Sequence, residues 1–192
     1  AIARMPQIWL LGVIGGFLYL PITAFAELWG VPYLMKIYSI DNQEASKATV
    51  MVFIGMAVGA PLFSFVAHFI KSYKNTIFIG AIIAALLFVA ICFPSHISYS
   101  QMCIILFCIG FFIGAELFVF TIARNITSDI YNATAMGFIN GLISFIGFVF
   151  QPFLGRILDF FWNGEIAENG VRIYSLASYQ YAIFAIASTL VI

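Results

Sequence analysis

Residues 101–124 read QMCIILFCIGFFIGAELFVFTIAR, an apolar stretch that holds a single carboxylate, Glu116. A bilayer core about 30 Å thick is crossed by roughly 20 helical residues, so this stretch predicts a membrane-spanning helix. Gly110 and Gly114 lie four residues apart on one face, where another helix can approach closely. Glu116 lies about 120° to 160° around the helix from these glycines, on a second face that it shares with Phe112. Because a charge against lipid is costly, the second face is expected to line a polar cavity or meet another helix.

The whole chain has the composition of a multi-pass membrane protein. It has 192 residues, of which 64% are hydrophobic and 8% charged, and its mean hydropathy is +1.08. Soluble domains carry roughly a quarter charged residues. The net charge is zero and no basic stripe is present, which argues against a nucleic-acid partner. The three cysteines lie in apolar runs without metal-site spacing, so we expect no metal and no cofactor.

Six apolar runs predict an all-α membrane fold. Two groups of three runs, with small-residue faces in the first, second, fourth and fifth, are the pattern of a three-helix unit and its inverted copy, which is half of a twelve-helix transporter. The fifth run is the richest in glycine, and we expect Gly137 and Gly141 to form a close-packing face. The last run is short of a full span and is expected to be truncated. The expected helices cover residues 8–38, 48–70, 76–93, 101–124, 133–158 and 179–192.

The first run is interrupted by two prolines, Pro21 and Pro32, which predict a kink or a broken end. Membrane helices tolerate such breaks when neighbouring helices satisfy the freed carbonyl groups. Glu27 in the same run lies roughly 28 Å along the helix, near the far boundary of the bilayer. It is therefore a candidate either for an interfacial position or for contact with a substrate.

Two stretches carry a resemblance to a known family. Residues 59–68, GAPLFSFVAH, followed by two lysines, are similar to the cytoplasmic loop motif of the major facilitator superfamily. Residues 133–141, ATAMGFING, and 151–159, QPFLGRILD, are similar to the glycine-rich penultimate helix of its members. The chain thus resembles the second half of such a transporter, helices seven to twelve, over nearly its whole length. The residues of the motif-like loop are Gly59, Pro61, His68, Lys71 and Lys74.

The first match departs from the family pattern at two positions. The family usually has glycine where Ser64 stands and aspartate where His68 stands, so a charge-based latch is not expected here. Residues 27–33, ELWGVPY, and 174–181, YSLASYQY, are similar to bacterial carriers that include the phagosomal amino-acid transporter branch.

The resemblance implies secondary active transport of a small polar metabolite, such as an amino acid, by alternating access across a bacterial inner membrane. It implies that the first and fourth helices line a central cavity, where Tyr19, Phe112 and Glu116 face the substrate, with Glu27 as a further candidate. Glu116 either binds a proton, as in a symporter, or fixes helix packing as a hydrogen-bonded residue.

The resemblance also bears on partners. The expected partner is the N-terminal half of the same transporter, because a central cavity needs both halves. The chain alone is then a fragment that is not competent for transport, and its exposed cavity face favours self-association.

Other classes of function remain open at this point. A drug or siderophore exporter of the same superfamily has the same architecture, and a channel or membrane-assembly subunit is the alternative from another class. An intramembrane enzyme needs an activated nucleophile or paired acids near a base. His68 and His96 both lie at helix ends, so we expect no catalytic residues and no enzyme.

Overall fold

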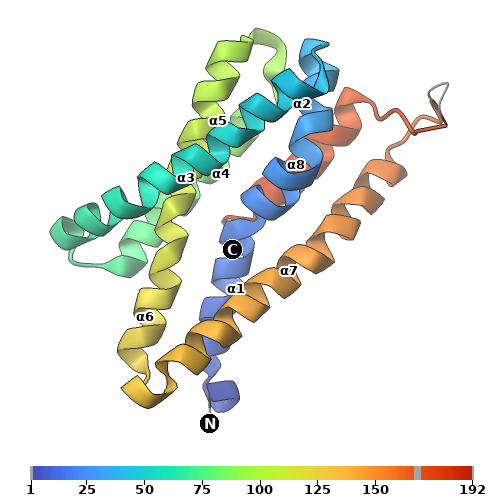
Figure 1. Cartoon of the computed structure of the whole chain (residues 1–192). Coiled ribbons are helices and arrows are strands. Elements are labelled where there is room, and N and C mark those ends of the chain that lie inside the picture. Colours follow the sequence, from blue (N-terminus) through green and yellow to red (C-terminus); the bar gives the residue numbers. More distant parts are fainter. Residues whose placement is uncertain (1, 167–169, 192) are drawn as a thin grey trace.

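The structure, a computed structural model, describes residues 2–166 and 170–191, apart from the side chains at positions 68 and 70. The described part is helical, with one isolated antiparallel bridge between Ile166 and Arg172 and no β-strand. Figure 1 shows long helices packed side by side, joined by short turns and by one longer loop before the last helix. The described part therefore has the predicted all-α architecture. Five segments are long and apolar enough to cross a membrane: Pro6–Tyr38, Asn42–Ala67, Tyr73–Ile91, Tyr99–Ile126 and Asp129–Phe160.

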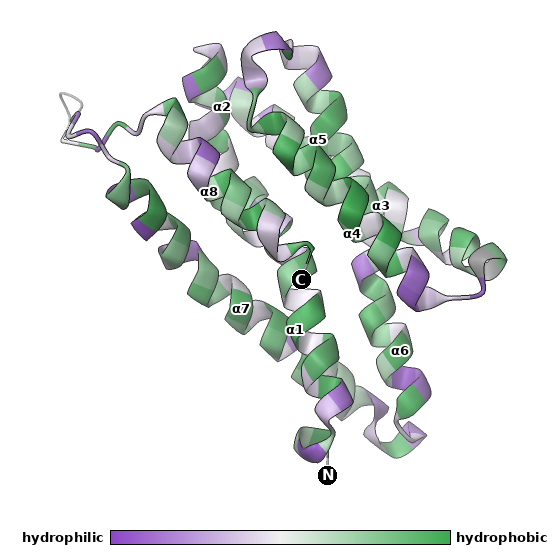
Figure 2. Cartoon of the chain, turned by 180° about the vertical axis from the view of Figure 1, so that it is seen from behind, coloured by the Kyte–Doolittle hydropathy of each residue, from purple (hydrophilic) through white to green (hydrophobic). Residues whose placement is uncertain are grey.

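Hydropathy follows this arrangement. In Figure 2 the helices are mostly hydrophobic along their lengths, and the strongly hydrophilic positions gather towards helix ends and connecting turns. A sixth helix, α8 (Leu176–Thr189), has 14 residues, which cover roughly 21 Å at the usual helical rise. It is shorter than the thickness of a bilayer core.

The first span is continuous but changes its helix type. It consists of α1 (Pro6–Leu20), a π-helical segment η2 (Pro21–Trp29) and α2 (Gly30–Tyr38). The expected break at Pro21 takes the form of this π segment. Proline has no N–H to donate and its ring clashes with the carbonyl four residues earlier, so a wider helix accommodates it.

The second span begins earlier than the sequence pattern predicts. Helix α3 covers Asn42–Ile70, whereas the expected start was residue 48. The Asp41 side chain caps the helix by accepting a hydrogen bond from the Glu44 N–H, at 2.8 Å. The polar residues after Asp41 have the composition of a loop. A capped first helical turn outside the membrane is also polar, so composition did not distinguish the two.

The remaining helices start within three residues of their expected positions. Serine side chains at positions 72, 98 and 175 each cap the helix that follows, which satisfies N–H groups that have no partner within the helix. The fourth span, like the first, is not a uniform α-helix, because a 3₁₀ segment interrupts it. The elements are α4 (Tyr73–Ile91), α5 (Tyr99–Ile113), the 3₁₀ segment η4 (Gly114–Leu117), α6 (Phe118–Ile126) and α7 (Asn132–Phe160).

Helices α3 and α5 approach one another backbone to backbone. A Cβ atom added to Gly110 would meet the backbone of Val52, and one added to Gly114 would meet the backbone nitrogen of Ala60. On the other helix, a Cβ at Gly55 or Gly59 would meet the backbone of α5. Glycine at these positions is what allows the two helices to lie in contact in Figure 1.

The prediction for the fifth run is wrong for contacts within the described chain. Gly137 and Gly141 of α7 have nothing within 4 Å of an added Cβ. Close packing on α7 occurs instead where α1 supplies the glycines, because Gly12 lies against Leu142 and Gly16 against Ile146. The sequence pattern locates small residues on a helix, but it does not say which of them have a neighbour.

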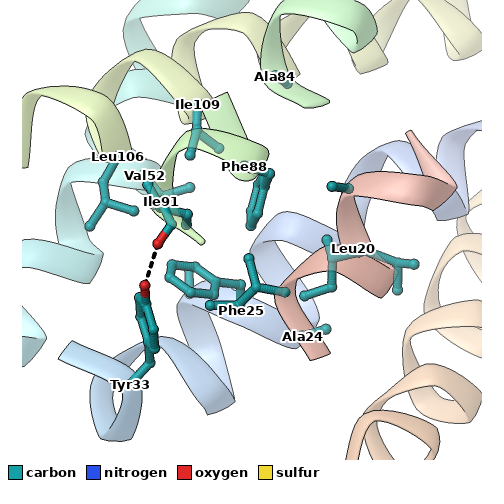
Figure 3. Packing of buried hydrophobic residues seen from close by; sticks show 14 of the residues in the cluster. Leu20, Ala24, Phe25, Tyr33, Val52, Ala84, Phe88, Ile91, Leu106 and Ile109 are labelled. Carbon is teal, nitrogen blue, oxygen red and sulfur yellow. Dashed lines mark hydrogen bonds between the residues drawn. The ribbon is translucent and has the colours of Figure 1, made fainter. Parts of the chain in front are cut away.

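A buried cluster of aromatic and aliphatic residues holds the π segment against α4. The Phe25 ring meets Phe88 edge to face with 5.4 Å between centroids, and both side chains are fully buried. Figure 3 shows the hydroxyl of Tyr33 donating a hydrogen bond to the carbonyl oxygen of Ile91 within this cluster. These contacts fix the first span next to the third and so position the residues on its other face.

Candidate functional site

The two irregular helix segments lie on either side of one cavity. The π segment η2 belongs to the first span and the 3₁₀ segment η4 to the fourth. Tyr19 lies just before η2, and Glu116 lies within η4. The cavity has a volume of about 290 Å³ and is partly open. It is lined by Tyr19, Thr23, Met56, Glu116, Leu117, Phe120, Asn140, Ile143 and Ser144.

Glu116 is the charged residue of this lining. Its side chain is 2% exposed, and its Oε1 atom has no hydrogen-bond partner among the described residues. A Cβ atom added to Gly15 of α1 would lie 3.2 Å from that oxygen, so the carboxyl group rests against bare backbone. The residues that line the cavity include no lysine, arginine or histidine. The carboxyl group is therefore buried without a cation, an arrangement that is costly and typical of functional residues in membranes.

The other polar side chains of the cavity come from the first and fifth spans. The Thr23 hydroxyl donates to the Tyr19 carbonyl oxygen at 3.4 Å. Asn140 and Ser144 are four residues apart on α7 and both exposed to the cavity side. In the described part of the chain, no hydrogen bond within the protein occupies the side chains of Tyr19, Asn140 or Ser144, so they can serve a ligand.

A side chain of α7 supports the π segment. Gln151 donates through its Nε2 atom to the Thr23 carbonyl oxygen at 2.9 Å, and Gly147 packs against the Thr23 side chain. The carbonyl group that Pro21 frees lies about four residues earlier in the chain, so the contact of Gln151 with Thr23 is a separate support of the π segment. This contact fixes the distance between the two walls of the cavity.

The structure brings together two of the four predicted cavity residues, Tyr19 and Glu116. Phe112 lies elsewhere, because its ring packs 6.0 Å from that of Phe63 on α3. The prediction assumed a uniform α-helix of about 100° per residue, whereas a 3₁₀ helix turns about 120° per residue. Segment η4 therefore rotates Glu116 away from Phe112. Glu27 is exposed on η2 and is not part of the cavity lining.

Sequence reasoning did not single out Thr23 or Ser144 as cavity residues. A signal was available for Ser144, since it shares a helical face with Asn140. Thr23 carried the same signal, because it follows the predicted cavity residue Tyr19 by four residues.

The motif-like residues lie on and after α3, away from this cavity. Gly59 and Pro61 are inside the helix, and Lys71 ends it in a left-handed conformation with φ of 52°. Lys74 lies in the first turn of α4. His68 belongs to the last turn of α3, but its side chain lies outside the part that the structure describes.

A second cavity of about 250 Å³ lies next to α3. Pro61 and Ser64 line it from α3, and Leu117 separates it from the Glu116 cavity because this residue lines both. The described residues contain no group of three or more His, Cys, Asp or Glu side chains that could hold a metal ion.

Comparisons with known proteins add no assignment: no family model matches the chain, and no curated protein matches it.

Proposed function

We propose that this chain is the C-terminal half of a major facilitator superfamily transporter and takes part in proton-coupled transport of a small polar metabolite, such as an amino acid, across a bacterial inner membrane. The observation that carries the proposal is Glu116, a buried carboxyl group whose Oε1 atom has no partner among the described residues and which lines a cavity between apolar helices. Carboxyl groups in such positions commonly form part of proton or substrate pathways.

The positions of the irregular segments support a transporter. Non-helical or distorted backbone is tolerated at membrane depth where it is buried in protein or lines a cavity, and interrupted helices form the substrate sites of many secondary transporters. Here the distorted segments η2 and η4 belong to the first and fourth spans. In a three-helix unit followed by its inverted copy, these are equivalent helices, so the proposed repeat accounts for two interruptions at one site.

The proposal assigns Glu116 to proton binding. Tyr19 is the other titratable side chain of the lining, and it comes from α1. Helix α3 contributes Met56 and helix α7 contributes only uncharged side chains. Glu116 is thus the group through which an imposed pH gradient would act on a substrate in this cavity.

The proposed partner is the N-terminal half of the transporter, seated on the exposed face of α7. Gly137 and Gly141 leave open space on this face, and a stripe of glycines in a membrane helix is suited to close contact with another helix. Without that partner the same face is available for self-association of the chain.

The test begins with a ligand. A thermal-shift screen of the full transporter against amino acids, sugars, nucleosides and drugs identifies a compound that binds the folded state, because such a compound raises its apparent stability. Uptake of that compound into proteoliposomes under an imposed pH gradient is then measured. We expect saturable accumulation that is lost in Glu116→Gln.

A matched control is Glu44→Gln, which removes a carboxylate from the exposed first turn of α3, outside the cavity. We expect this variant to accumulate the compound as the wild type does. Undiminished accumulation by Glu116→Gln would refute the proton-binding role, and flux that does not saturate would indicate a channel instead of a carrier.

A further inference from the structure

The Glu116 cavity has the chemistry of a site for a cation. Its one carboxyl group presents an Oε1 acceptor that has no donor among the described residues, and its lining residues include no lysine, arginine or histidine to supply one. A buried acceptor is completed by a ligand that donates an N–H or O–H group, and a buried carboxylate favours a donor that also carries positive charge. An anionic ligand would be repelled by the ionised carboxylate of Glu116.

The remaining lining fits the other parts of such a ligand. Asn140 and Ser144 offer an amide and a hydroxyl group on the wall that the fifth span forms. Leu117, Phe120 and Ile143 provide apolar surface for a carbon skeleton. The cavity thus combines one charged anchor with a mixed polar and apolar wall, as small-molecule sites commonly do.

The volume suits a small ligand. At about 290 Å³ the cavity lies at the lower end of the range of small-molecule sites, roughly 300–1,000 Å³. A small amine, with its ammonium group against Glu116, fits this space.

We infer that the substrate class of this cavity is a small organic ammonium ion, whose N–H groups donate to the Glu116 carboxylate while its carbon skeleton lies against Phe120 and Ile143. This inference rests on the proposed transport function and narrows its substrate. It does not depend on the driving force for transport, because the contact between the ammonium group and Glu116 forms when the ligand binds.

The test compares three probes of similar shape, one positively charged, one neutral and one negatively charged. Benzylammonium, benzyl alcohol and benzoate are titrated separately against the full transporter in detergent, and the apparent unfolding temperature is followed at each concentration. A ligand that binds the folded state raises this temperature with concentration. We expect saturable stabilisation by benzylammonium and at least about tenfold weaker binding of the alcohol and of benzoate, since both lack the charged N–H donor.

Variants assign the effect to the cavity. In Glu116→Gln we expect binding of benzylammonium to weaken at least about tenfold, while Glu44→Gln retains it. Glu116→Asp keeps the carboxylate on a shorter side chain and provides a second comparison if the glutamine variant does not fold. We expect it to retain the preference for benzylammonium over benzyl alcohol.

Equal binding of the alcohol, a preference for benzoate, or benzylammonium binding that is unchanged in folded Glu116→Gln would overturn the inference. So would the absence of stabilisation by methylammonium, butylammonium and benzylammonium alike. These outcomes are distinct from failure of the proposed function. If the compound found by screening is neutral or anionic and its gradient-driven uptake still requires Glu116, the substrate class is wrong and the transport function stands.

Discussion

Gly110→Ala tests the close contact between α3 and α5, around which one side of the bundle is built. A Cβ atom at position 110 would lie 2.7 Å from the carbonyl carbon of Val52 and 2.9 Å from its Cα, with the carbonyl oxygen closer still. All three are backbone atoms of a neighbouring helix, so no side-chain rotation can make room. The two helices must move apart locally, which weakens the contacts of the neighbouring residues as well.

The expected cost follows from two opposing effects. Overpacking a close contact costs about 1–3 kcal/mol, and a rigid backbone neighbour favours the upper end of that range. Alanine regains up to about 1 kcal/mol over glycine through its helix propensity. We therefore expect Gly110→Ala to lower the free energy of unfolding by about 2 kcal/mol.

Two matched substitutions complete a graded series. At Gly12 an added Cβ would lie 2.5 Å from Cδ1 of Leu142, which a rotamer change can move, and 2.9 Å from its Cβ, which only a small backbone shift can move. Gly12→Ala should therefore be destabilising but cost less than Gly110→Ala, where every near atom is backbone. At Gly155 the nearest atom is Cζ2 of Trp29 at 3.5 Å, an ordinary contact, so Gly155→Ala should be neutral or gain up to about 1 kcal/mol. Equilibrium unfolding in mixed micelles measures all three. If Gly110→Ala is as stable as Gly155→Ala, the backbone contact between α3 and α5 is wrong.

Two further predictions concern surfaces outside this contact. Gly137→Ala should leave the stability of the isolated chain unchanged or slightly raised, because open space surrounds the position. The same variant should impair uptake by the full transporter, because the proposed N-terminal half packs there. Unimpaired uptake would count against this docking face. Asp159→Asn should lower the pKa of Tyr174. This pKa is raised above its ordinary value of 10.0 first by burial and then by the hydrogen bond to Asp159. Ultraviolet titration of the variant and the wild type measures the change. With a raised phenol pKa, the stabilisation from Tyr174 is complete below pH 10.0 and is lost as the pH rises through the raised value, so stability should fall less steeply above pH 10.0 in Asp159→Asn than in the wild type. Near neutrality the variant should differ from the wild type only by the loss of the ion pair between Asp159 and Arg172, which contributes little to stability because it is exposed to solvent.

The sequence alone determined the class of fold and where most helices lie. Apolar runs of membrane-spanning length have few alternatives, because every backbone polar group must be satisfied within the bilayer. The same reasoning identified Glu116 as the residue to explain, since a carboxylate inside such a run is rare and costly. It also identified Gly110 and Gly114 as small residues on one face, and the structure places both against α3.

Only the tertiary structure decided which side chains meet at the cavity. Residues on different spans are brought together by helix packing, so Thr23 of the first span and Ser144 of the fifth share a lining that no sequence spacing records. Phe112 was misplaced because the sequence pattern assumed a uniform α-helix, while the 3₁₀ segment Gly114–Leu117 changes the rotation along the fourth span. Gly137 has no close neighbour within the described chain, because a small side chain permits close packing but does not supply the neighbour. Local periodicity sets what a helix can present, and the packing of the whole chain sets what that face contacts.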